Sequence, residues 1–195
     1  MVPFVGLTGG LGSGKSTALE ALRRLGAEVL SSDAVVHELY ESAPLRDAVI
    51  ARFGADVAPG GVVDRAAVAR RAFATDHDRA WLEGQVWPLV GARVAQWLEQ
   101  ARAKRPAPPA AVVEVPLLFE AGLEQMYDAT IAVTADESVR RRRASERGHA
   151  LVDERAARQL SQEEKAQRAT FVVVNDGSVE DLERKLSVVL GKLGG

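Results

Sequence analysis

The chain has 195 residues, of which 47% are hydrophobic and 27% are charged, and its formal net charge at pH 7 is −2. This length suits one domain, or one domain with an insert, and the composition excludes disordered proteins, which combine low hydrophobicity with high net charge. The near-neutral charge gives no basic field to attract nucleic acid or an anionic membrane, and the absence of cysteine excludes a disulfide framework, a thiolate nucleophile and a cysteine-ligated metal.

The N-terminal stretch predicts a strand, a glycine-rich turn, a helix and a second strand. Val2 to Thr8 is an apolar run ended by Gly9-Gly10, as in a strand buried on both faces. Residues 15–25 place leucines at helical spacing, and Gly26 supplies the stop. Ala27 to Leu30 reads as a second short strand.

The next part of the chain, residues 35–109, predicts an inserted helical subdomain. The helical pattern is too long for a simple crossover between parallel strands, so we expect it to shape the substrate side. It ends in the proline-rich run Arg105 to Pro109, a stiff connector. Breaks are expected at Pro44, Phe53-Gly54, Pro59-Gly60-Gly61 and Pro88. A monomer is expected, with weak self-association left open, because such a subdomain could serve a substrate or a neighbouring chain.

The remaining residues return to alternating strands and helices. The expected strands are Ala111 to Val115, Thr130 to Thr134 and Phe171 to Val174, and the expected helices are 136–147, 153–168 and 179–193. Five buried-type strands alternating with helices predict an α/β fold with a five-stranded parallel sheet. No apolar run approaches the roughly 20 residues that span a bilayer, and the N-terminus lacks the features of a signal peptide. We therefore expect a soluble, cytoplasmic protein with no membrane partner.

The strongest motif, G-x-x-x-x-G-K-[ST], runs from Gly9 to Ser16 between a predicted strand and a predicted helix. Glycines let backbone N–H groups converge on phosphate oxygens, and the helix adds unpaired amides and the positive end of its dipole. Lys15 can reach the β- and γ-phosphates, and the Ser16 hydroxyl can ligate Mg²⁺. A chance glycine-rich turn is the alternative, which the strand-to-helix context disfavours. The predicted nucleotide-binding residues of the loop are Gly12, Ser13, Gly14, Lys15, Ser16 and Thr17.

Two classes of phosphate-loop protein compete at this point. A GTPase needs an Asn-Lys-x-Asp run after a late strand, where this chain has Val174-Asn175-Asp176-Gly177. A small-molecule kinase needs a mobile basic lid, which the arginine-rich residues 140–147 fit. The residues thus favour a kinase over a regulatory nucleotide-binding protein. A nucleic-acid role for the arginines is disfavoured because no base-stacking aromatic residues accompany them.

Taken in order, the motifs resemble those of dephospho-coenzyme A kinases, from about Val5 to Leu190. The run Gly6 to Thr17 is nearly the family's signature, and Pro116-Leu117-Leu118-Phe119-Glu120 narrows the match. Further matching positions are Asp33, Phe53-Gly54, Gly61 to Arg65, the arginines of residues 140–147, Gln159 and Asn175-Asp176-Gly177.

The resemblance implies a phosphotransferase that uses MgATP to phosphorylate the ribose 3′-hydroxyl of dephospho-CoA, giving coenzyme A and ADP in the last step of coenzyme A biosynthesis. It also implies the architecture of nucleotide monophosphate kinases. The expected parts are a phosphate-loop NTPase core of residues 1–34, 110–135 and 159–195, a helical substrate-binding insert of residues 35–109, and a helical lid of residues 136–158. Another phosphate-loop kinase, for a nucleoside, a nucleotide or a sugar acid, is the nearest alternative.

Asp33 follows the second predicted strand, at the carboxyl edge where open parallel sheets bind ligands. The resemblance implies that it accepts the proton of the attacking hydroxyl or holds that hydroxyl in line. An N-cap of the next helix is the alternative. The family usually has Asp-x-Asp here, whereas this chain has Ser31-Ser32-Asp33, so the role of the first carboxylate is lost or moved.

Mg²⁺ is the expected cofactor, bound together with ATP. Ser16 would ligate it, and Glu114, at the end of the third predicted strand, would order its water shell. The family more often has Asp at that position, but an octahedral Mg²⁺ site tolerates ligation through water. The alternative for Glu114 is a partly buried carboxylate that fixes the adjacent loop.

The segment Pro116 to Glu120 has no reactive group apart from Glu120. The resemblance implies that it shapes the floor beneath the dephospho-CoA moiety, with Leu117 and Phe119 as substrate-binding residues. From the residues themselves, core packing is the favoured role of Leu117 and Leu118.

Two positions of the expected insert are singled out by the resemblance. Arg65 is assigned to a substrate phosphate, with a local ion pair to Asp64 as the alternative. Trp87-Pro88 stands where the family usually has His-Pro, and an indole cannot transfer a proton. His37 is interpreted as a helix-surface residue.

Arg143 and Arg147 best match the paired lid arginines of the family, and the resemblance therefore assigns them to the γ-phosphate. Successive helical residues point about 100° apart, so Arg140 to Arg143 cannot all face one ligand, whereas Arg143 and Arg147 share a face. Arg140 stands where the family commonly has Gln, and Arg155 is a further candidate.

Asn175, after the last predicted strand, is assigned to adenine through main-chain and amide groups. A left-handed turn residue is the alternative, and both can hold together. The predicted catalytic residues are Lys15, Asp33 and Arg143.

Overall fold

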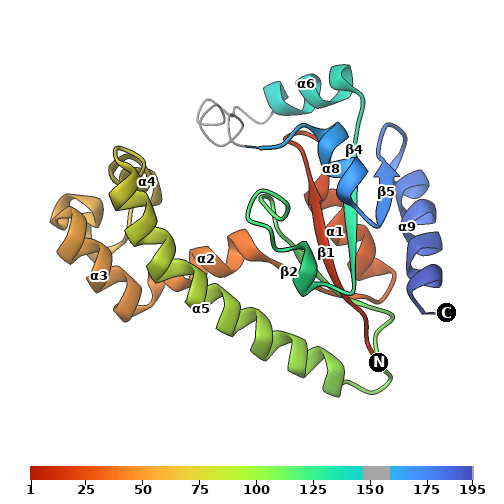
Figure 1. The fold of residues 1–195 in the computed structure, drawn as a ribbon, viewed down its shortest axis with the longest axis horizontal. Helices are drawn as coiled ribbons and strands as arrows, with labels where there is room; N and C mark the ends of the chain where they lie inside the picture. The colour runs from red at the N-terminus through yellow and green to blue at the C-terminus, as the bar shows by residue number, and fades with distance from the viewer. Residues whose placement is uncertain (147–158, 195) are drawn as a thin grey trace. The chain divides into compact units, whose positions relative to one another are not determined.

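The computed structural model describes residues 1–146 and 159–194, and their ribbon is drawn in Figure 1. Within these ranges five strands form one parallel sheet in the order β2-β3-β1-β4-β5, which confirms the predicted fold class. The strands are β1 (Phe4–Gly9), β2 (Glu28–Ser31), β3 (Ala111–Glu114), β4 (Ala129–Thr134) and β5 (Phe171–Val174).

Helices lie between the strands and after the last one. They are α1 (Lys15–Arg24), α2 (Ser32–Glu41), α3 (Ala43–Phe53), α4 (Arg65–Ala72), α5 (Asp76–Ala103), α6 (Glu137–Glu146), α8 (Gln162–Arg168) and α9 (Val179–Leu193). Of these, α2 to α5 follow one another between β2 and β3. In the described part of the chain, short 3₁₀ turns accompany them at η1 (Ala55–Val57), η2 (Pro59–Gly61) and η3 (Glu124–Met126).

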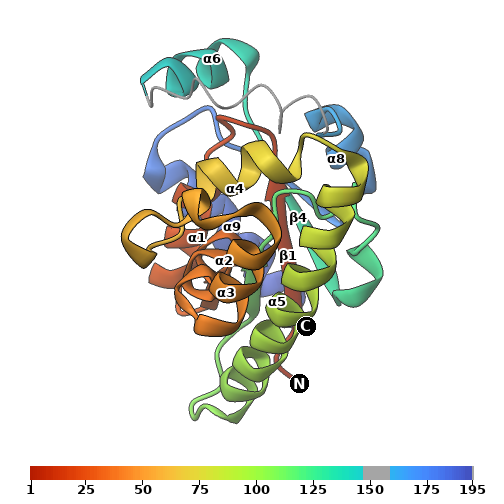
Figure 2. The same ribbon diagram turned by 90° about the vertical axis from the view of Figure 1, so that its left-hand side faces the viewer.

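Strand β1 lies at the centre of the sheet, and its apolar run is buried along its whole length. Helices α1 and α9 pack together over one face of the sheet, and α8 lies on the other face against β1 and β4 (Figures 1 and 2). The core between the sheet and α1 and α9 includes Leu7, Leu22, Ile131 and Leu186, each of them fully buried. Because β1 is held on both sides and on both faces, the loop that leaves its carboxyl end starts from a rigid element.

The chain divides into two compact units, Met1–Ser31 with Leu98–Gly195, and Ser32–Trp97. The second unit is helical and has its own core, which includes Tyr40, Val49, Val68 and Val86. This unit begins three residues before the expected insert of residues 35–109 and ends twelve residues before the end of that insert, because the last turns of α5 belong with the sheet unit.

Two expectations about helices were wrong. Pro88 lies inside the 28-residue helix α5 rather than ending it. One proline costs a helix about 3 kcal/mol, and the packing of Val86 and Val90 in the core of the helical unit opposes this cost. The helix expected across 153–168 does not include residues 159–161, because Ser161 caps α8 in a reciprocal capping box with Glu164.

Over residues 1–146 and 159–194, the structure contains no helix that is both long enough and apolar enough to cross a membrane.

Candidate active site

The loop between β1 and α1, residues 10–14, has positions that only glycine can occupy, and we call it the glycine cradle. A Cβ atom at Gly14 would lie 2.2 Å from the Asn175 Nδ2 atom, and one at Gly12 would lie 2.6 Å from the Arg140 carbonyl oxygen. Both glycines also have positive φ angles, 72° at Gly12 and 90° at Gly14, which L side chains rarely adopt. Glycine at these two positions therefore lets the loop backbone approach Asn175 and Arg140 closely.

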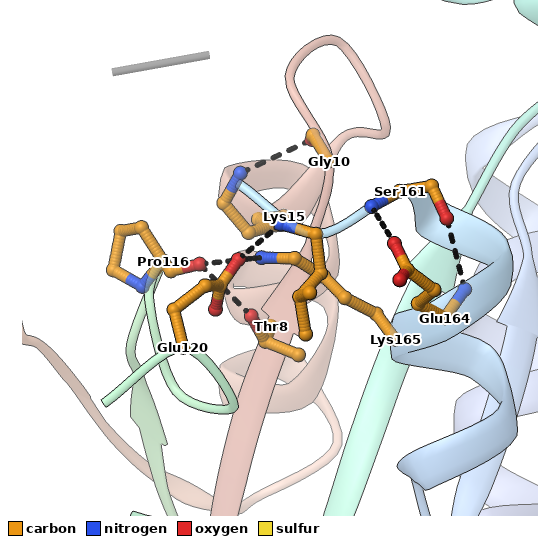
Figure 3. A network of polar contacts seen from close by, with 9 residues as sticks. Thr8, Gly10, Lys15, Pro116, Glu120, Ser161, Glu164 and Lys165 are labelled. Carbon is orange, nitrogen blue, oxygen red and sulfur yellow. Dashed lines mark hydrogen bonds and ion pairs between the residues drawn. The ribbon is translucent and has the colours of Figure 1, made fainter. Parts of the chain in front are cut away.

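Helix α1 begins directly after the cradle with Lys15, Ser16 and Thr17. Its first turn carries no acidic side chain, so nothing within the helix offsets the positive end of the dipole. The Lys15 Nζ atom folds back and donates to the Gly10 carbonyl oxygen at 3.2 Å (Figure 3). Ser13 is fully buried, and its hydroxyl has no hydrogen-bond partner in the described ranges. Together these groups suit an anion.

Asn175, after β5, ties the cradle to the sheet. Its Nδ2 donates to the Ser13 carbonyl oxygen at 2.9 Å, and its backbone N–H donates to the Thr134 carbonyl oxygen at 2.8 Å. The side chain is buried, with 4% of its surface exposed. The phosphate loop thus uses one of the two N–H donors of this amide, and the assignment of Asn175 to adenine stays a prediction.

Two arginines of α6 reach the same loop. Arg143 Nη1 donates to the Asn175 carbonyl oxygen at 3.1 Å, and Arg140 Nε donates to the Leu11 carbonyl oxygen at 2.9 Å. The structure thus brings predicted Arg143 to the cradle and adds Arg140, which was not assigned a role. Arg147 and Arg155 lie outside the described residues.

We expect Asn175→Ala to raise the dissociation constant for MgADP about tenfold, since one hydrogen bond is lost and a buried carbonyl is left without its partner. Isothermal titration calorimetry measures this change. Ser178→Ala is the matched control, because it removes a polar contact that caps α9 and touches no residue of the loop. An unchanged dissociation constant for MgADP in a folded Asn175→Ala variant would show that the amide does not hold the phosphate loop in its binding conformation.

Glu114 is the last residue of β3, which pairs with β1, the strand that leads into the phosphate loop. In the sheet register it lies opposite Leu7 of β1 on one side and Ser31 of β2 on the other. Ser16, in the first turn of α1, is exposed. A hydroxyl and a carboxylate at this edge are donors that Mg²⁺ accepts, and the ion usually takes its other ligands from phosphates and water. No group of three or more acidic, histidine or cysteine side chains within residues 1–146 and 159–194 could hold a metal without such help.

The loop after β3 only partly follows expectation. Leu118 is fully buried, as core packing requires, whereas Leu117 is 38% exposed and does not pack in the core. Phe119 is 2% exposed and lies under the Arg168 guanidinium, 5.0 Å from the ring centre. Its ring has almost no surface left for a ligand, so we place Phe119 in the packing of the loop and keep Leu117 as the substrate-contact candidate.

A polar network missed by sequence reasoning lies beside this loop (Figure 3). Lys165 of α8 is fully buried and pairs with Glu120, with 3.0 Å between Nζ and Oε1. The Pro116 carbonyl oxygen accepts from both Lys165 Nζ, at 2.7 Å, and Thr8 Oγ1, at 3.2 Å. The only sign of this network in the sequence was that Glu120 is the one charged residue of the segment Pro116 to Glu120.

In the helical unit, Asp33 is exposed in the first turn of α2. The helix already begins at Ser32, so Asp33 lies inside it rather than at its N-cap. No hydrogen bond or ion pair to this carboxylate occurs within the described residues, which leaves its oxygens available to a ligand.

Arg65 is exposed at the start of α4, and its Nη1 lies 3.1 Å from His37 Nδ1. The alternative pair with Asp64 is not formed, because the Asp64 carboxylate caps α4 by accepting from two backbone N–H groups. Arg65 and His37 line a cavity of about 290 Å³. Trp87 is 60% exposed on α5.

Comparison with known proteins decides the family. The model described as dephospho-CoA kinase matches residues 3–181. The chain belongs to the dephospho-CoA kinase family. The dephospho-CoA kinase of Anaeromyxobacter dehalogenans is 42% identical over 196 residues, 98% of this chain and 92% of that protein. The dephospho-CoA kinase of Thermus thermophilus is 39% identical over 197 residues, which are 98% of this chain and 92% of that protein.

Solved structures share the fold. TT1252 from Thermus thermophilus is 37% identical, with a TM-score of 0.82 over 100% of this chain and 99% of that one. A dephospho-CoA kinase from Campylobacter jejuni, at 22% identity and a TM-score of 0.71, covers 100% of this chain and 98% of that one. A shikimate kinase from Acinetobacter baumannii is 15% identical, with a TM-score of 0.51 over 98% of this chain and 95% of that one. The last two show the fold alone.

Proposed function

We propose that this member of the dephospho-CoA kinase family transfers the γ-phosphoryl group of ATP to the ribose 3′-hydroxyl of dephospho-CoA. The products are coenzyme A and ADP, and the reaction is the last step of coenzyme A biosynthesis. The observation that carries the proposal is the glycine cradle with Lys15 and Arg143 beside it, in a chain of a family named for this substrate.

In the proposed reaction, the acceptor oxygen bonds to the γ-phosphorus while the bond from that phosphorus to the β–γ bridging oxygen breaks, and ADP leaves with the bridging oxygen. Asp33 accepts the proton that the hydroxyl loses. Lys15 and Arg143, joined by Arg147, stabilise the charge of the transferring group. Backbone amides of the cradle hold the phosphates, so the transfer step is mostly a matter of positioning and electrostatics.

Mg²⁺ is the proposed cofactor, held by Ser16 and, through water, by Glu114. When bound, the ion neutralises charge on the phosphates. Residues 35–109 bind the acceptor, with Arg65 on a substrate phosphate and Leu117 as a further contact, and residues 136–158 act as the lid. The protein works as a cytoplasmic monomer, with weak self-association left open, and takes neither nucleic acid nor membrane as a partner.

The test is ADP release from MgATP with dephospho-CoA, adenosine, AMP and shikimate as parallel acceptors, with the product identified by mass spectrometry. We expect turnover with dephospho-CoA and coenzyme A as the product. Turnover with only another acceptor would support the ATP site and reject dephospho-CoA as the substrate.

A further inference from the structure

Lys165 is a fully buried charge that the proposed reaction does not use. A lysine in this position loses the hydration of its ammonium group and needs polar partners in return. It has two, the Glu120 carboxylate at 3.0 Å and the Pro116 carbonyl oxygen at 2.7 Å. Glu120 is 13% exposed at its side chain, so both charges of the pair are largely removed from water.

The pair joins three segments that are distant in sequence. Thr8, near the end of β1 and just before the phosphate loop, donates to the same Pro116 carbonyl oxygen. Glu120 Oε1 also accepts from the Leu160 backbone N–H at 2.8 Å. The Lys165–Glu120 pair therefore links the end of β1, the loop after β3 and the entry to α8 (Figure 3).

The entry to α8 is in turn tied to the start of the α6 segment. Gln162 Nε2 donates to the Ala135 carbonyl oxygen at 2.8 Å, and its Oε1 accepts from the Ala135 N–H at 3.1 Å. Asp136 follows, and hydrogen bonds from the Ser138 side chain and backbone hold the pKa of its carboxyl below the ordinary value. Residues 135–138, at the start of α6, and residues 160–162, at the entry to α8, are thus fastened to each other, and α6 carries Arg140 and Arg143.

Stability alone does not account for such a pair. Replacing a buried ion pair by apolar side chains of similar volume is often neutral or stabilising, whereas removing one partner is strongly destabilising. What an ion pair adds over apolar packing is direction, because each hydrogen bond fixes a particular atom. Here the atoms fixed are the Pro116 carbonyl oxygen, in the loop after β3, and the Leu160 amide, at the entry to α8.

We propose that Lys165 is a positioning residue for phosphoryl transfer. With Glu120, it holds the loop after β3 and the entry to α8 against β1. Through Gln162 this fixes the start of α6, and so keeps Arg140 and Arg143 in place over the phosphate loop. The proposal rests on the proposed function for its kinetic readout, but it concerns transfer from ATP and holds for any acceptor.

Lys165→Met tests it, because methionine keeps most of the volume and removes the charge and the donors. We expect kcat to fall about 10²-fold, as for a misplacement of about 1 Å in a site, while the dissociation constant for MgADP changes less than about threefold. Leu186→Ala is the control for stability: it opens the core under α9 and touches no residue of the network. Assayed where both variants are folded, it should keep its kcat within about twofold.

The double variant Glu120→Gln, Lys165→Met separates positioning from stability. It removes both charges and keeps an amide oxygen for the Leu160 N–H, so the melting temperature should return toward the parent value while kcat stays low. Recovery of kcat together with the melting temperature would overturn the proposal. So would an equal loss of kcat in the Leu186 variant at matched stability.

If the parent protein turns over none of the acceptors, the proposed function fails and hydrogen exchange decides the inference. In the MgADP-bound protein, Lys165→Met should speed backbone amide exchange in residues 117–120, 137–143 and 160–162, and Leu186→Ala should speed it in α9. Unchanged exchange in those three segments would reject the positioning role.

Discussion

Lys15→Ala is expected to lower kcat by about 10²- to 10³-fold without unfolding the protein, because it removes a preorganised positive charge aimed at the phosphates. Lys15 is half-buried, and its Nζ contacts the Gly10 carbonyl oxygen across the loop. Truncation therefore opens no cavity in the core between the sheet and α1. The loss should appear in kcat with dephospho-CoA as acceptor, measured as ADP release, and the circular dichroism spectrum should stay that of the parent.

Lys192→Ala is the matched control, since it removes an exposed lysine at the end of α9. Its kcat should equal that of the parent protein. A Lys15 variant with near-parental turnover would reject the assignment of this loop to phosphate binding.

Asp33→Asn is expected to lower kcat by roughly 10²-fold or more, since an amide keeps the shape of the side chain and cannot accept the proton of the acceptor hydroxyl. The dissociation constant for MgADP should be little changed, because the cradle, Lys15 and Arg143 are untouched. Steady-state kinetics with both substrates varied, together with calorimetry for MgADP, separates the two effects.

Glu38→Gln gives the comparison for that experiment. Glu38 is an exposed carboxylate on the same helix, α2, so the change alters net charge equally and should leave kcat near the parent value. If Asp33→Asn also retains kcat, the first-turn carboxylate of α2 stabilises the helix dipole and takes no part in transfer.

Local patterns were enough to predict the sheet and the phosphate loop. The apolar runs of β1, β3 and β4 are buried strands because both faces of a parallel sheet are covered. The loop follows from its glycines, since Gly12 and Gly14 have backbone angles and neighbours that exclude a side chain. Both features depend on residues close together in sequence, where periodicity and backbone preference act.

Contacts between distant residues were beyond that kind of reasoning. The side-chain amide of Asn175 donates to the carbonyl oxygen of Ser13, 162 residues away. The turn in which Asn175 lies gave no sign of this contact. Nothing local to α8 marks Lys165 as a buried lysine either, because its partner carbonyl, at Pro116, is 49 residues earlier in the chain.

The sequence by itself thus determined the fold class, the phosphate loop and, through its motifs, the family to which the chain belongs. Only the tertiary structure decided which side chains of one motif are buried and which reach the loop. It placed Phe119 under Arg168 and left Leu117 exposed, and it brought Arg140 to the Leu11 carbonyl. The physical reason is that burial and hydrogen bonding of a side chain depend on the elements packed against it, which neighbouring residues in sequence do not specify.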